Sequence, residues 1–417
     1  MTQLHKYNSK ILPRRVADLL SDRSRLPSFR CLSVIRWGDV SQDNTRVDSK
    51  ISVVASSPVH QTLVAASTDS GEIGIFLNGT DGPTTSNRAM LKFSVQEGSG
   101  RQRQVAGVTG LRFLEEHVLV SSSRQGSIKV WDCTNVSRSK EVLNILSREP
   151  VTALTVPAYP GNTVIISGSS GGSVHVRDLR FNSGESDKGM KARSSPITYL
   201  CTSSNQYQVI AGDHEGNIDI WDTRSASNIP LSSLNGNSSH SRPGIIAELP
   251  QPRPKSTKKP DISEDIWDIA MGKKRKSSQH SDGAVSLRIP PVFQEDKPQR
   301  TKAHHDKVVA LGVVDSGIIA SVSADKTAKL FCKLSGNLLG EHKLKDKPLS
   351  AEFHAGMLCV GKRQGFELVE SITSSVLSSY SNTSTHVGHV HAVAFAGDWG
   401  VCTGGMDHHV FIHRIET

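Results

Sequence analysis

Two arginines in the 417-residue sequence stand in the same local setting and could both bind a partner protein. Each follows an aspartate by two residues at the end of an alternating apolar segment: Arg180 after Asp178, and Arg224 after Asp222. Guanidinium groups bind carboxylates in bidentate fashion and are favoured in interface ion pairs. The sequence therefore predicts a protein-docking site at these four residues. A local salt bridge within each pair is the alternative.

A second charged feature is a basic run inside a segment rich in Pro, Ser and Lys. It consists of Lys273, Lys274, Arg275 and Lys276. Such runs in exposed loops are typical of nuclear import signals or nucleic-acid patches, and a solvated charge run is the third interpretation. The formal net charge of +9 also leaves polyanions such as RNA open as partners. We expect a nuclear protein, with the nucleolus as an alternative and a cytoplasmic fraction.

The sequence lacks the common patterns of catalysis. There is no HExxH, no GxSxG, no EF-hand loop and no dinucleotide fingerprint after a strand. Residues 356–363 begin like a phosphate-binding loop, but no Ser or Thr follows Lys362 and an apolar strand separates the glycines. Six histidines near the C-terminal end suggest a metal site, but no cysteine or carboxylate set completes one. They are His386, His389, His391, His408, His409 and His413. We expect no enzyme activity, no metal and no cofactor.

The six cysteines and the hydropathy pattern indicate the cellular environment. The cysteines are far apart, with no CxxC pair, which favours reduced thiols of an intracellular protein over disulfides or a zinc ribbon. No stretch approaches the ~18 consecutive apolar residues of a membrane-spanning helix, and the N-terminus lacks the apolar core of a secretory signal. We expect neither a membrane protein nor a secreted one.

The elements that must position these residues recur along the chain. An apolar strand, small residues, a turn with Asp or Gly and an alternating strand appear seven times, which predicts an all-β fold. One column of the repeat runs Phe76, Trp131, Arg177, Trp221, Phe331, Glu370 and His413. The interval from Trp221 to Phe331 is far longer than the others. We expect Arg177 to be partly exposed, unlike the tryptophans of its column.

This repeat resembles the tryptophan–aspartate (WD) repeat family, whose unit has four strands and about 40–45 residues. The resemblance rests on the repetition from residue 29 to residue 417, on Trp131-Asp132 and Trp221-Asp222, and on Gly388-His389. It implies a seven-bladed WD-repeat β-propeller closed by an N-terminal strand. It also implies that His304 and His389 bond buried turn aspartates.

The long interval places an insert between blades four and five. The expected parts are an N-terminal extension (1–28), blades one to four (29–224, with the closing strand 29–37), a disordered insert rich in basic residues, Pro and Ser (225–302), and blades five to seven (303–417). Residues 282–288 imitate the repeat, so an eighth blade is the alternative architecture.

A further resemblance suggests one kind of partner. Residues 209–224 and 165–180 are similar to the sixteen-residue box by which some WD-repeat substrate receptors dock on the adaptor of cullin-4 ubiquitin ligases. That likeness implies Arg224 and Arg180 as adaptor contacts. The leading hypothesis is a non-catalytic scaffold, monomeric within a larger nuclear complex, that binds other proteins on its propeller faces. The alternatives are a cullin-4 substrate receptor and an RNA- or ribosome-precursor-associated assembly factor that contacts RNA through the basic insert.

Overall fold

The structure is a computed structural model that describes most of the repeat region. The described residues are 28–37, 50–57, 63–77, 91–97, 104–134, 140–157, 163–180, 188–191, 194–203, 207–224, 232–234, 302–315, 317–370, 376–380, 386–396 and 400–416. All of them belong to one compact unit, Met1–Asn237 with Arg300–Thr417. The basic run at 273–276 and the candidate eighth-blade segment at 282–288 lie outside the described residues.

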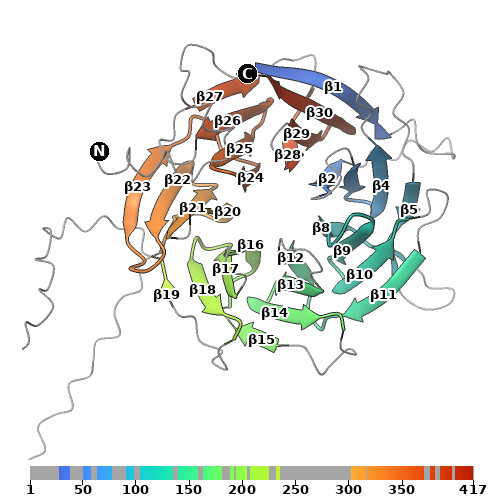
Figure 1. Cartoon of the computed structure of the whole chain (residues 1–417), viewed down its shortest axis with the longest axis horizontal. Helices are drawn as coiled ribbons and strands as arrows, with labels where there is room; N and C mark the ends of the chain where they lie inside the picture. Colours follow the sequence, from blue (N-terminus) through green and yellow to red (C-terminus); the bar gives the residue numbers. More distant parts are fainter. Residues whose placement is uncertain are drawn as a thin grey trace, which may run out of the picture. The chain divides into compact units, whose positions relative to one another are not determined.

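The described strands form seven antiparallel sheets of four strands, arranged as blades around a ring (Figure 1). From the innermost strand outward, blade 1 is β2 (Ile51–Ser56), β3 (Leu63–Thr68), β4 (Glu72–Leu77) and β5 (Leu91–Ser94); blade 2 is β8 (Val108–Phe113), β9 (Val118–Ser123), β10 (Ser127–Asp132) and β11 (Lys140–Leu146). Blade 3 is β12 (Val151–Thr155), β13 (Val164–Ser169), β14 (Ser173–Asp178) and β15 (Lys188–Lys191); blade 4 is β16 (Ile197–Thr202), β17 (Gln208–Asp213), β18 (Ile218–Asp222) and β19 (Ser232–Ser233).

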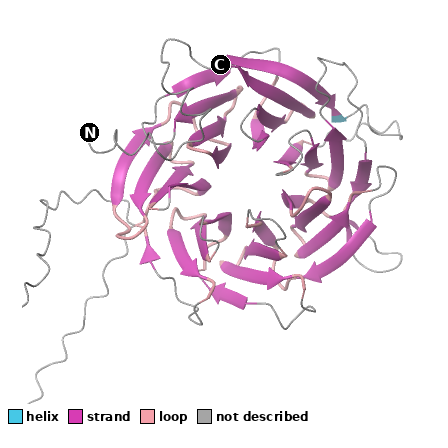
Figure 2. Ribbon diagram, in the orientation of Figure 1, coloured by secondary structure: helices cyan, strands magenta, loops and turns pink. Residues whose placement is uncertain are grey.

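The second half of the ring repeats this order. Blade 5 is β20 (Val308–Asp315), β21 (Ile318–Ser323), β22 (Thr327–Cys332) and β23 (Leu338–Lys343); blade 6 is β24 (Ser350–His354), β25 (Met357–Gly361), β26 (Phe366–Glu370) and β27 (Val376–Tyr380). Blade 7 is β28 (Val390–Ala396), β29 (Gly400–Gly405), β30 (His409–Glu416) and β1 (Ser28–Arg36), and a small hairpin joins β6 (Gln96–Glu97) to β7 (Gln104–Val105). The predicted all-β, seven-bladed propeller is confirmed. The described residues contain no α-helix, Figure 2 shows only one very short helical segment, and no helix among them has the length and apolar character needed to cross a membrane.

The ring is completed by strands from opposite ends of the chain. β1 pairs antiparallel with β30, from Ser28 opposite Glu416 to Arg36 opposite His409. Ile35 of β1 is fully buried in the apolar cluster between blades 7 and 1. β1 therefore covers the edge of β30 that would otherwise be open to pairing with another chain.

Apolar clusters join each pair of neighbouring blades within the described part of the chain. Glycines on second strands allow the next blade to approach closely. A Cβ built on Gly212 of β17 would lie 2.6 Å from a methyl of Val308 on β20, and one on Gly404 would lie 2.4 Å from Ile51. The small residues of the repeat are therefore required by blade-to-blade packing.

Hydrogen bonds between innermost strands add a polar link to this packing. In blades 1 to 4 the register skips one residue in the first strand, and the skipped residue carries a hydroxyl. Each of these hydroxyls donates to a carbonyl of the following blade, and Ser350 of blade 6 does the same. The bonds run from Ser52 to Val108 (3.4 Å), Thr109 to Val151 (2.8 Å), Thr152 to Ile197 (2.5 Å), Thr198 to Val308 (2.7 Å) and Ser350 to Val390 (3.1 Å). In blades 1 to 4, a β-bulge in the first strand thus turns the hydroxyl of the skipped residue toward the neighbouring sheet.

The start of the predicted insert is wrong. Ser232 and Ser233 lie in the range 225–302, yet they form β19, which pairs with Asp219 and Ile220 of β18. Leu234 follows and is buried. The sequence does not reveal this strand, because two residues are too few to show an alternating pattern. Residues 235–301 lie outside the described residues, as does the N-terminal extension up to residue 27.

Candidate functional site

The two predicted docking pairs lie at the same end of neighbouring blades, where β14 and β18 finish. Arg180 Nη2 is 2.6 Å from Asp178 Oδ2, and its Nε is 3.1 Å from both carboxylate oxygens. Arg224 donates to Asp222 in the same way, from Nε at 3.0 Å and from Nη2 at 2.7 Å. Each aspartate also accepts the backbone N–H of its arginine, so a local turn sets the pair. The local salt bridge that the sequence left open is present in both blades.

Both guanidinium groups nevertheless face solvent. The side chain of Arg180 is 68% exposed and that of Arg224 is 61% exposed, whereas their aspartates are mostly covered. The hydrogen bond from Arg180 lowers the pKa of Asp178 to about 2, and the bond to Asp222 raises the pKa of Arg224. The Arg224 guanidinium also stacks on the exposed ring of Tyr207, 4.5 Å from its centroid. We call these five residues the Asp–Arg surface.

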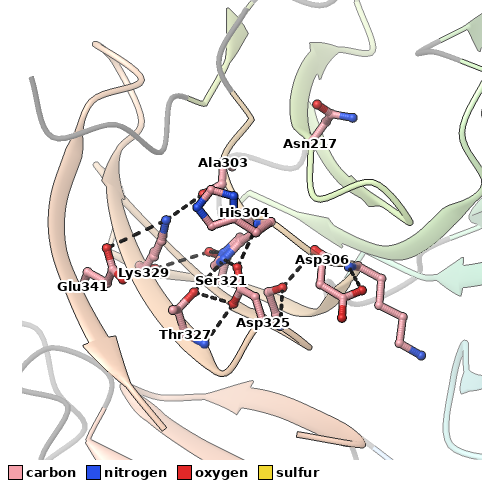
Figure 3. A network of polar contacts seen from close by, with 12 residues as sticks. Asn217, Ala303, His304, Asp306, Ser321, Asp325, Thr327, Lys329 and Glu341 are labelled. Atoms are coloured by element: carbon pink, nitrogen blue, oxygen red, sulfur yellow. Dashed lines mark hydrogen bonds and ion pairs between the residues drawn. The ribbon is translucent and has the colours of Figure 1, made fainter. Parts of the chain in front are cut away.

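A second kind of aspartate network is buried in blade 5 (Figure 3). His304 contacts Asp325 and Thr327 through Nδ1, at 3.2 and 2.9 Å, and Ser321 through Nε2, at 2.7 Å. Burial lowers the pKa of His304. Burial alone would raise the pKa of Asp325, but the hydrogen bonds from His304 and Thr327 outweigh it and hold that pKa below its ordinary value. His304 is therefore a structural histidine bonded to a turn aspartate.

Blade 7 repeats this network with a different histidine from the one expected. His386 Nδ1 lies 3.0 Å from both carboxylate oxygens of Asp407, and its Nε2 lies 2.8 Å from Thr403 Oγ1. His389, the predicted partner, instead accepts a hydrogen bond from Arg363 Nε at 3.2 Å. His386 stands four residues before Val390, where β28 begins, just as His304 stands four residues before Val308, where β20 begins.

The two tryptophans of the repeat differ in their polar contacts. Trp131 donates from Nε1 to Ser121 Oγ of the neighbouring strand, at 2.8 Å. Ala211 stands at the corresponding position beside Trp221, and the buried indole N–H has no acceptor among the described residues. The indole N–H of Trp131 thus has a hydrogen-bond acceptor, whereas that of Trp221 has none among the described residues.

Two other members of the column depart from the prediction. Arg177 is buried rather than partly exposed, with Nη1 3.5 Å from Ser167 Oγ, the residue that corresponds to Ser121. In blade 6 the column residue is Val369, not Glu370, because β26 pairs Gly361 with Phe366 across a turn one residue shorter than that of blade 4.

The C-terminal histidines serve blade packing and turns. His413 is fully buried, with its ring 4.9 Å from that of Phe366 and stacked 6.0 Å from Phe411. His389 and His391 lie with their rings 5.6 Å apart. No group of three or more His, Cys, Asp or Glu side chains in the described ranges could hold a metal ion.

Sequence reasoning missed three polar side chains in the centre of the ring. Arg112, Tyr199 and Glu352 line a cavity of about 190 Å³ among the innermost strands, which we call the channel cavity. A signal was available in the sequence: these three residues are large and polar, whereas the corresponding first-strand positions of most other blades are small or apolar. Their position around one cavity depends on closure of the ring, which cannot be predicted from the pattern of a single strand.

Comparison with known proteins gives one partial likeness. No protein-family model matches the chain. A THO complex subunit 6 homolog from Danio rerio is 25% identical to it over 173 residues, which are 39% of this chain and 50% of that protein. The chain thus spans half the length of the curated relative that it matches.

Proposed function

We propose that this chain is a non-catalytic propeller of the WD-repeat class that acts as a protein-interaction scaffold in a nuclear multiprotein complex. The observation that carries the proposal is its similarity to a protein named as a THO complex subunit. We infer that it occupies a comparable place, as one subunit of a complex of that kind. A fold alone names no partner, so the likeness supplies the kind of assembly and the ring supplies the surfaces.

We place one docking contact at the Asp–Arg surface. Its two guanidinium groups are exposed, held in fixed orientation by Asp178 and Asp222, and presented by adjacent blades. Pre-ordered arginines lose less side-chain entropy when a partner binds. Tyr207 adds an exposed aromatic ring beside Arg224, and Arg and Tyr are enriched at binding hot spots. An acidic segment of a partner protein suits this surface best.

Affinity purification of the tagged full-length chain with mass spectrometry tests the scaffold proposal. We expect a stable set of co-purifying proteins that includes THO complex subunits and survives nuclease treatment. Recovery of the chain alone would contradict the proposal. Recovery of a cullin-4 adaptor, or loss of all proteins after nuclease treatment, would favour the ligase or the RNA-assembly alternative instead.

A matched deletion separates the ring from the insert. The deleted segment is 235–301, replaced by a short Gly/Ser linker, because β19 must remain. Because the deletion also removes residues 273–276, both forms are added as purified protein to the same lysate. We expect the co-purifying proteins to be retained, since the proposed contacts lie on the blades.

Nuclear import is assigned to Lys273, Lys274, Arg275 and Lys276. Replacing all four by Ala in a fluorescently tagged chain is expected to shift the protein toward the cytoplasm. An unchanged nuclear signal would remove import from this segment.

A further inference from the structure

The channel cavity is lined by polar groups from alternate blades. Arg112 is on β8 of blade 2, Tyr199 on β16 of blade 4 and Glu352 on β24 of blade 6. Arg112 pairs with Val120 and Glu352 with Cys359, and each of these partners lies two residues before the small residue of its second strand. Arg112 and Glu352 therefore lie at the same depth of the ring, on different walls.

Arg112 is a partly buried cation that forms no ion pair with the described residues. Its Nη1 donates to the carbonyl of Leu111 at 3.1 Å, and no carboxylate of the described residues is within ion-pair distance. Buried lysines elsewhere are paired: Lys129 with Glu141 at 2.7 Å, and Lys362 with Glu367. A guanidinium has five N–H donors, and a cation withdrawn from water is costly unless paired.

Glu352 does not supply the missing charge. Its Oε2 accepts the backbone N–H of Phe395 at 2.7 Å, which holds the carboxyl on the opposite wall. Burial raises the pKa of Glu352, although Arg112 opposes that shift, so the neutral form is favoured more than in water. The Tyr199 hydroxyl lies near Arg112, and burial raises its pKa, so it remains a hydrogen-bond donor.

Two lysines, Lys50 and Lys307, lie near His391, which also lines the cavity. Burial lowers the pKa of His391, and the nearby Lys50, His389 and Lys307 lower it further, with Asp69 opposing them. Positive charge in a confined channel raises the local concentration of anions. An anion in this cavity would meet the Arg112 guanidinium, which forms no ion pair with a described carboxylate.

We propose that the channel cavity binds a small anionic group, a carboxylate or a phosphate, with Arg112 and Tyr199 as its contacts. A volume of about 190 Å³ holds a group of a few heavy atoms and excludes a folded segment or a nucleic-acid strand. Arg112 pairs with the anion, the Tyr199 hydroxyl donates to it, and the surrounding hydroxyls of the first strands line its walls. The anion comes either from a free small molecule or from an acidic side chain of a bound peptide.

Isothermal titration calorimetry with the full chain tests the site. The probes are succinate, inorganic phosphate and a short acetylated peptide rich in Asp and Glu. We expect at least one to bind wild-type protein, and Arg112→Gln to weaken that binding by about tenfold or more. Arg124→Gln removes an exposed arginine that does not line the cavity, and it should leave the affinity unchanged.

The pattern of binding identifies the source of the anion. Binding of succinate or phosphate indicates a free small anion, and binding of the peptide alone indicates a partner's acidic side chain. If Arg112→Gln fails to fold, Tyr199→Phe removes one contact atom and should still weaken the binding. The proposal is overturned if no probe binds wild type at millimolar concentrations, or if the folded variants bind as wild type does. Because the probes are two small anions and a synthetic peptide, and none is a cellular partner protein, this outcome is independent of the co-purification result.

Discussion

Blades 3 and 4 use aspartates differently from blades 5 and 7. In blades 3 and 4, Asp178 and Asp222 each hold an arginine that remains more than 60% exposed. In blades 5 and 7, Asp325 and Asp407 each hold a histidine whose side chain is at most 1% exposed. Both kinds of pair join a carboxylate to a nitrogen-containing side chain, but the pairs of blades 3 and 4 face solvent and those of blades 5 and 7 are buried.

This difference suggests different roles for the two pairs of blades. Exposed ion pairs contribute little to folding stability because water and salt screen them. A buried, hydrogen-bonded pair is different, since removal of one partner leaves an unsatisfied polar group inside the protein. We infer that blades 5 and 7 use their networks for stability, whereas blades 3 and 4 present theirs to partners.

The largest effect is expected from Asp325→Ala, because it removes the buried carboxylate that bonds His304 and accepts the Thr327 N–H. The free energy of unfolding should fall by about 3–5 kcal/mol, measured by urea denaturation. Asp306→Ala is the matched control: Asp306 forms a half-exposed pair with Lys347 and should cost less than about 1 kcal/mol. Equal losses at the two positions would remove the distinction between buried and exposed aspartates.

The next largest effect is the loss of folding stability at acidic pH caused by His413 of blade 7. Burial lowers the pKa of His413 to about 3, while an unfolded histidine titrates near 6.5. Between these two pKa values the unfolded state binds a proton at His413 and the native state does not. The contribution of the neutral, buried His413 to the free energy of unfolding is therefore fully present above about pH 6.5. It falls by up to about 1.4 kcal/mol per pH unit as the pH drops from 6.5 toward 3.

His413→Gln should flatten this dependence, measured as the slope of unfolding free energy between pH 6.5 and 4. His117→Gln, which changes an exposed histidine, should leave the slope as it is in wild type. A slope that persists in His413→Gln would assign the acid sensitivity to other groups.

A smaller difference is expected between the two tryptophans. Trp131→Phe loses a hydrogen bond to Ser121, whereas Trp221→Phe removes an indole N–H that has no acceptor in the described part of the chain. Trp131→Phe should therefore be the more destabilising by about 1 kcal/mol in thermal or urea unfolding. Ala211→Ser offers Trp221 an acceptor and should stabilise blade 4. Equal losses for the two Phe variants would show that the hydrogen bond is not the deciding term.

The number of blades could be predicted from sequence because each blade repeats a strand, small residues and a turn. The small residues are required by close approach, as Gly212 against Val308 illustrates, and they recur in every blade except blade 5, which has Val322 at this position. Residue-level assignments failed where one residue changed the register. The shorter turn after Gly361 moved the column to Val369, and the true start of β28 selected His386.

The burial of Arg177 and the channel cavity could not be read from single strands. Arg177 is buried, and its Nη1 lies 3.5 Å from the hydroxyl of Ser167 on the neighbouring strand, where other blades have a hydroxyl that contacts Trp or His. Arg112 and Glu352 are 240 residues apart in sequence and meet only when the ring closes. Such sites depend on contacts between blades, which the repeat pattern does not encode.

The most direct test compares Arg224→Ala with wild type in a quantitative pull-down from the same lysate, at equal amounts of folded protein. The melting temperature should barely move, because the arginine is exposed and, among the described residues, contacts its own turn and Tyr207. Recovery of at least one partner protein should fall sharply. If both forms recover the same proteins in the same amounts, the Asp–Arg surface is not a docking contact and the division of roles between the blades is wrong.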